Sequence, residues 1–171
     1  MTYCAAPARG PRVILSARAG VPADVVATVS ALLAPEVAVG LDPAPPEDPS
    51  GRTKAVEVRS TIARGAWPRG TVTIVSGPAR TRFLTRVGGW TDRRRRVALV
   101  STDGLDLADA TDRARLAKIV AHEAGHVLGL RHCRQPACVA AFAPDPSALD
   151  GLTGFCPRCR RRLSRAEGFA P

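Results

Sequence analysis

Residues 120–133 read VAHEAGHVLGLRHC, and this stretch holds all three histidines of the 171-residue chain. It overlaps the segment 111–130 (TDRARLAKIVAHEAGHVLGL), whose apolar residues recur at helical spacing. We predict one long helix there, capped by Thr111 or Asp112, with Asp112 also suited to the positive end of the helix dipole. Gly129 should end the helix, because glycine readily adopts the left-handed conformation that turns the chain. The predicted apolar stripe consists of Leu116, Ile119, Val120, Val127 and Leu128.

Helical spacing puts His122 and His126 one turn apart on the same face, where both imidazoles can reach one metal ion. A sharp turn at Gly129 would bring His132 beside them as a third ligand. Three imidazoles suit zinc and leave a fourth position for water, and Glu123 can act on that water as general base and acid. The alternative is a core helix that happens to carry histidines, but such a helix has no need of Gly129.

Four of the five cysteines follow the histidine motif. Cys133 and Cys138 form one pair, and Cys156 and Cys159 form a second pair 18 residues later. This spacing is typical of the two knuckles of a structural Cys4 zinc site, which holds a segment with little core of its own. Buried free thiols are the alternative. Cys4 lies far outside the cluster and is predicted to be a free thiol.

With these residues, the chain resembles the archaemetzincin (archaelysin) family of zinc metallopeptidases in the metzincin clan. The extended motif His-Glu-x-x-His-x-x-Gly-x-x-His is complete at residues 122–132, and FCPRC occupies 155–159. The resemblance covers residues 122–159 and implies peptide-bond hydrolysis with two zinc ions. It implies a catalytic zinc on His122, His126 and His132, Glu123 as general base and acid, and a structural zinc on Cys133, Cys138, Cys156 and Cys159.

The sequence departs from the family at one position. The family has Cys-x-Met after the first cysteine pair, and that methionine forms an apolar floor beneath the catalytic zinc, whereas this chain reads Cys138-Val139-Ala140. Phe142 is the predicted replacement that fills the space. The alternative hypothesis is therefore a catalytically impaired zinc-binding homologue, which acts as a binding module for an acidic protein or nucleic acid.

The rest of the chain predicts an α+β (α/β-like) fold with a mixed twisted β-sheet. We expect one compact metzincin-type domain over 1–171, in which residues 1–130 carry the sheet and the active-site helix. Residues 131–171 are expected to form an irregular C-terminal subdomain held by the Cys4 zinc. The expected strands are 13–17, 36–41, 71–77, 82–90 and 95–101, the expected further helices are 21–35 and 53–67, and 42–51 is an expected surface loop.

Composition and net charge indicate which classes of molecule the protein is expected to bind. The formal net charge of +10 favours acidic ligands, but aromatic residues make up only 4% of the chain, so nucleic acid is not the expected partner. We expect a monomer that acts on a peptide or protein. Arg82 and Arg86, on a predicted edge strand over 82–89, would favour acidic residues in that substrate. The alternative is that these arginines belong to an ordinary solvated face. No apolar run is long enough for a membrane span or a signal peptide, which predicts a soluble, cytoplasmic protein.

Overall fold

The computed structural model describes residues 12–17, 21–42, 56–81 and 88–166. Its central feature is a mixed five-stranded sheet in the order β2-β1-β4-β7-β6. The first four strands are parallel, and β6 pairs antiparallel with β7 at one edge. A parallel pair, β3 and β5, forms a separate ribbon. The strands are β1 (Arg12–Ala17), β2 (Ala38–Asp42), β3 (Val56–Glu57), β4 (Thr71–Val75), β5 (Ala79–Arg80), β6 (Gly89–Asp92) and β7 (Val97–Ser101).

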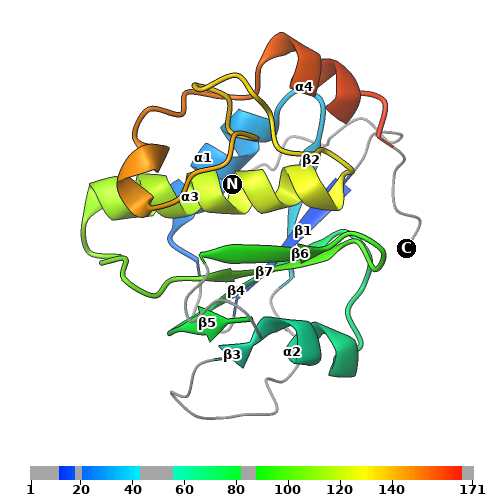
Figure 1. The fold of residues 1–171 in the computed structure, drawn as a ribbon, viewed down its shortest axis with the longest axis vertical. Helices are drawn as coiled ribbons and strands as arrows, with labels where there is room; N and C mark the ends of the chain where they lie inside the picture. The colour runs from blue at the N-terminus through cyan, green and yellow to red at the C-terminus, as the bar shows by residue number, and fades with distance from the viewer. Residues whose placement is uncertain (1–11, 18–20, 43–55, 82–87, 167–171) are drawn as a thin grey trace.

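Helices cover both faces of this sheet, as Figure 1 shows. On one face lie α1 and α3, and on the other lies the short helix α2. The alternation of β7 explains this arrangement: Ala98 and Val100 contribute to the core with α1 and α3, whereas Val97 and Leu99 pack with α2. The helices are α1 (Ala23–Leu33), α2 (Val58–Arg64), α3 (Ala110–Val127), the 3₁₀ turn η1 (Pro146–Leu149) and α4 (Pro157–Leu163).

Most of the predicted elements are present, and the fold class is confirmed. The expected helix over 53–67 is shorter than predicted, because Val56–Glu57 is a strand and the Glu57 side chain accepts a hydrogen bond from Ser60 N that caps α2. The predicted strand over 82–90 is observed only as β6, because 82–87 lie outside the described residues. Most of the predicted loop at 42–51 lies outside them as well.

The long helix α3 begins earlier than predicted. Its N-cap is Asp109, whose carboxylate accepts a hydrogen bond from Asp112 N at 2.9 Å, so the choice of Thr111 or Asp112 as the cap was wrong. Asp112 does lie in the first turn, near the positive end of the helix dipole. At the other end Gly129 has φ +95°, the left-handed conformation that was expected after the helix.

The segment after α3 folds back over the helix with little regular structure (Figure 1). Two isolated bridges, Cys133 with Ala141 and Cys138 with Gly154, hold its turns together. Phe155, which is 4% exposed, packs into the same core as the sheet, close to Gly125 of α3. The C-terminal segment thus shares the core of the domain.

Candidate metal centre

The turn at Gly129 brings the three histidines together. His122 and His126 project from one face of α3, and His132 follows the turn beneath it. One ring nitrogen from each of the three lies within 4.8 Å of the others. That spacing allows one ion to be reached by all three side chains.

Two main-chain carbonyl groups orient the first two rings. His122 Nδ1 lies 2.7 Å from the Val139 carbonyl oxygen, and His126 Nδ1 lies 2.8 Å from that of Leu130. Because a carbonyl oxygen only accepts, each Nδ1 carries the proton and each Nε2 keeps a free lone pair. Burial lowers the pKa of His122 to about 4 and also lowers that of His126. The two imidazoles are therefore neutral at pH 7, the form that binds a metal ion.

Glu123 lies beside the histidines and is 6% exposed. Burial raises the pKa of its carboxyl group to about 7, although a hydrogen bond from Thr91 acts in the opposite direction. Thr91 Oγ1 donates this bond to Glu123 Oε2. A buried carboxyl group with a pKa near neutrality is suited to taking up and releasing protons.

Strand β6 provides the opposite wall of the site. Its antiparallel register pairs Gly89 with Val100 and Thr91 with Ala98, so residues 89 and 91 face α3. A Cβ atom at Gly89 would lie only 2.6 Å from Glu123 Oε1. Sequence reasoning did not identify Gly89 or Thr91, because their relation to α3 depends on a strand pairing that no motif encodes.

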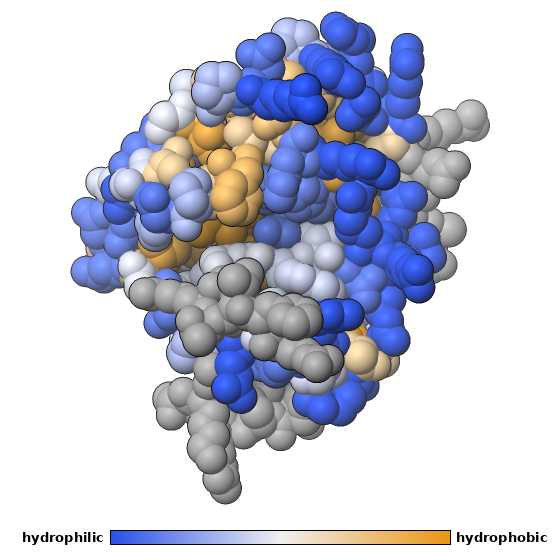
Figure 2. Space-filling model, in the orientation of Figure 1, coloured by the Kyte–Doolittle hydropathy of each residue, from blue (hydrophilic) through white to orange (hydrophobic). Residues whose placement is uncertain are grey.

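The histidines and Glu123 line a cleft of about 1010 Å³. Its lining includes the apolar residues Ile119, Leu105 and Leu149. It also carries charges of both signs, with Arg93 and Arg131 opposed by the carboxyl groups of Asp103 and Asp145. Figure 2 shows an apolar patch left of the centre of this face, with hydrophilic residues to both sides of it and above it. The cleft is large enough for part of a peptide chain and offers both apolar and charged contacts to it.

The predicted replacement of the family's methionine by Phe142 is wrong. The Phe142 side chain is 68% exposed and lies against His132, with a distance of 5.4 Å between the ring centroids. Ala140, at the position expected for the methionine, is 1% exposed, and its carbonyl oxygen accepts a hydrogen bond from Cys133 N. The main chain of this turn therefore supports the site, through the Val139 carbonyl group as well.

The four cysteines of the motif form a second cluster. One sulfur atom from each lies within 4.8 Å of the others, and the Sγ atoms of Cys133 and Cys156 are 3.8 Å apart. A disulfide needs about 2.05 Å, whereas sulfurs bound tetrahedrally at about 2.3 Å from zinc lie about 3.8 Å apart. Burial acts to raise the pKa of Cys156, but hydrogen bonds from Cys159 and the other cysteines lower it to about 7. The cluster is able to bind a metal ion.

Comparison with known proteins finds relatives of the segment that carries both clusters. The family model "Peptidase family M54" matches residues 112–165. An archaemetzincin of Pyrobaculum aerophilum is 46% identical over 52 residues, which are 30% of this chain and 34% of that protein. Archaemetzincin-2 of Mus musculus is 41% identical over 56 residues, 32% of this chain and 16% of that protein. These matches support the assignment of the segment over residues 112–165 to the archaemetzincin family.

Solved archaemetzincin structures have the same fold over nearly the whole chain. The crystal structure from Methanopyrus kandleri has a TM-score of 0.72 at 24% identity and covers 92% of this chain and 95% of its own. The crystal structure from Archaeoglobus fulgidus, in complex with malonate, has a TM-score of 0.70 at 22% identity. The match covers 88% of this chain and 99% of the Archaeoglobus chain. In the curated archaemetzincins the matched segment spans about a third of the protein or less.

The family match supports a dependence on zinc and does not favour the alternative of a non-catalytic binding module. Within the described ranges, no helix is both long enough and apolar enough to cross a bilayer.

Proposed function

We propose that this protein is a zinc-dependent metallopeptidase. The observation that carries the proposal is the convergence of three histidines in a cleft whose wall also contains the buried carboxyl group of Glu123. His122, His126 and His132 would hold the catalytic ion. Zinc bound there would supply Lewis-acid chemistry, which polarises a carbonyl group and lowers the pKa of water.

Glu123 moves the protons in this proposal. Its carboxylate takes a proton from the attacking water, and the resulting carboxylic acid delivers that proton to the leaving amine. Burial raises the pKa of Glu123 to about 7, whereas a nearby dication favours the carboxylate. The hydroxyl group of Thr91 holds one carboxyl oxygen and so restricts the rotation of the side chain.

A second zinc would bind the cluster of four cysteines and hold the irregular C-terminal segment, which gives two ions per chain. The separation of the sulfur atoms supports this assignment, since zinc binds cysteine side chains in a tetrahedral arrangement. We also propose a cytoplasmic location, where cysteines more often bind metal ions than form disulfides. We also propose a single domain over 1–171 that acts as a monomer.

The substrate would be a peptide or protein with acidic residues. The support for this preference is local: Arg93 and Arg131 lie on the cleft wall, although Asp103 and Asp145 line it too. The earlier candidates for it, Arg82 and Arg86, lie outside the described residues.

The test is cleavage of a mixed peptide library by the zinc-loaded protein, with and without a chelator, beside Glu123→Ala. We expect cleavage that the chelator stops and zinc restores, and none by the variant. The variant must bind as much zinc as the wild type, because Glu123 is no ligand in this proposal. Undiminished cleavage by Glu123→Ala would refute the role of this residue.

A further inference from the structure

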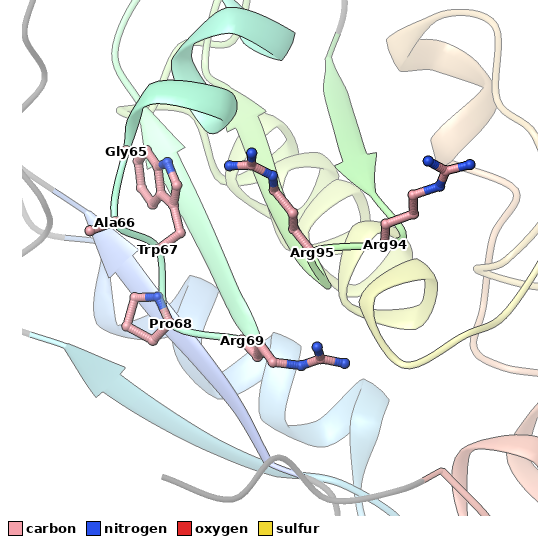
Figure 3. Close-up of a pocket in the computed structure, with 7 residues that line it drawn as sticks. All are labelled: Gly65, Ala66, Trp67, Pro68, Arg69, Arg94 and Arg95. Atoms are coloured by element: carbon pink, nitrogen blue, oxygen red, sulfur yellow. The ribbon is translucent and has the colours of Figure 1, made fainter.

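A second pocket lies on the far side of the turn that joins β6 and β7. It has a volume of about 590 Å³ and is lined by residues 65–69, together with Arg94 and Arg95. Figure 3 shows its two walls: residues 65–69 follow α2, and the two arginines come from the turn. We call it the Trp67 pocket. None of its described lining residues is acidic.

Two of its three arginines are available to a ligand. The side chains of Arg69 and Arg94 are exposed and make no hydrogen bond or ion pair with the other residues that the structure describes. Arg95 is engaged instead, because its Nη1 donates to the carbonyl oxygens of Ile62 at 2.9 Å and Ala63 at 3.1 Å. It therefore ties the turn to α2 and leaves the other two guanidinium groups free for an anion.

The pocket is rigid on both sides. On one side Trp67 packs so closely on Gly65 that a Cβ atom there would lie 2.1 Å from the indole nitrogen. On the other side Asp92 Oδ1 accepts hydrogen bonds from the main-chain N–H groups of Arg94 and Arg95, which fixes the turn. In Figure 3 Arg95 points toward the half-buried indole, and the free guanidinium groups of Arg69 and Arg94 lie farther along the pocket. Tryptophan and arginine are enriched at recognition surfaces.

The turn also connects this pocket to the candidate active site. Arg93 lines the cleft, together with Arg131, whereas the next residue, Arg94, lines the Trp67 pocket. A peptide chain that leaves the basic part of the cleft and crosses the turn would therefore reach the Trp67 pocket within a few residues. Both pockets present guanidinium groups along this path.

We propose that the Trp67 pocket binds acidic side chains of a peptide substrate, away from the scissile bond. This inference rests on the proposed peptidase function. Guanidinium groups pair with carboxylates in two parallel hydrogen bonds, and the indole covers the aliphatic part of a glutamate side chain. A peptide is favoured over nucleic acid because the pocket has one aromatic wall and continues from a cleft suited to an extended chain.

Binding is measured first, without cleavage, on protein that carries Glu123→Gln. The probe is a fluorescent peptide with an apolar half and a glutamate-rich half, compared with its glutamine-for-glutamate version. Loss of two charge-assisted contacts in Arg69→Gln/Arg94→Gln should weaken binding of the acidic peptide about tenfold. The matched control is Arg161→Gln/Arg162→Gln, which removes the same charge from exposed residues of α4 and should leave binding unchanged. The proposal would be overturned if both variants lost affinity for the acidic peptide equally, or if neither variant lost any.

Charge reversal and a competitor decide what occupies the pocket. Arg69→Glu/Arg94→Glu should lose the glutamate-rich peptide and gain a lysine-rich one. Single-stranded oligothymidylate should compete only weakly. If it displaces the peptide efficiently, and its own affinity depends more strongly on Arg69 and Arg94, the pocket is a nucleic-acid site and the peptide assignment is wrong.

Cleavage is measured separately in protein that keeps Glu123. The ratio of kcat/KM for acidic over neutral peptides should fall about tenfold in Arg69→Gln/Arg94→Gln and keep the wild-type value in the α4 control. If no peptide is cleaved but binding still depends on these arginines, the peptidase proposal is wrong and the proposed binding role of the Trp67 pocket is supported. If peptides are cleaved with an unchanged ratio, the peptidase stands and the pocket is refuted.

Discussion

Thr91 Oγ1 donates a hydrogen bond to Glu123 Oε2, and this contact joins the edge strand β6 to the helix that carries the histidines. The two residues are 32 positions apart in the sequence. Because Thr91 shares a face of the sheet with Ala98, its hydroxyl group points at α3. The strand thus orients the proposed general base.

Thr91→Val, which keeps the shape of the side chain and removes the hydroxyl group, should lower kcat by roughly ten- to a hundredfold, the effect of one hydrogen bond to a charged group. The bond acts to lower the pKa of Glu123, so its loss should raise that pKa and move the acid limb of the pH–rate profile to higher pH. Thr91→Ser should restore both. An unchanged profile, with zinc content intact, would mean that Thr91 has no part in positioning Glu123.

Gly89→Ala tests the close approach of β6 to the same side chain. The added Cβ would lie 2.6 Å from Oε1 and 2.7 Å from Cγ of Glu123, so the carboxyl group must move. We expect kcat/KM to fall more than about tenfold with little change in zinc content. Gly88→Ala is the matched control, because its Cβ would meet only Ile119 Cδ1, at 3.7 Å. Similar activities in the two variants would contradict this reasoning.

Local pattern was sufficient to predict the helix, the turn at Gly129 and the two groups of side chains that come together and could hold metal ions. Spacing on a single helix places His122 and His126 together, and the left-handed glycine delivers His132 to them, so short-range geometry contains most of the site. The strands β1, β4 and β7 could also be predicted, because each is a short run rich in apolar and β-branched residues, which is typical of a buried strand.

Long-range pairing could not be predicted in the same way. Gly89 and Thr91 reach Glu123 only through the register of β6 on β7, and a shift of one residue would turn both away. The role of the turn around Ala140 could not be predicted for a related reason. The turn supports His122 through the main-chain carbonyl group of Val139, which a residue of any type would provide. The Phe142 side chain, which was expected to fill the space beneath the site, is exposed. Side-chain identity carries no information on such main-chain contacts.

Cys159→Ser tests the cysteine cluster as a structural zinc site. We expect the variant to retain about one zinc per chain instead of two and to melt roughly 10 °C or more below the wild type, because zinc bound to thiolates contributes directly to folding. Zinc content by atomic absorption and thermal unfolding provide the readouts. Cys4→Ser is the control, since Cys4 lies outside the predicted cluster, and it should keep both ions. Two zinc ions in Cys159→Ser would refute the assignment.

Leu163 tests whether the C-terminal segment folds as part of the same domain. Its side chain is 0% exposed and joins α4 to the core formed by the sheet, α1 and α3. Leu163→Ala should therefore lower the free energy of unfolding by roughly 2–5 kcal/mol, the effect of a cavity in a packed core. Leu41→Ala, at a leucine that is 51% exposed, should change it by less than about 1 kcal/mol. If denaturant unfolding gives a single transition whose midpoint falls only in Leu163→Ala, the segment and the sheet unfold together. A separate early transition for the variant would instead show that the zinc cluster and α4 form a unit that the core does not stabilise.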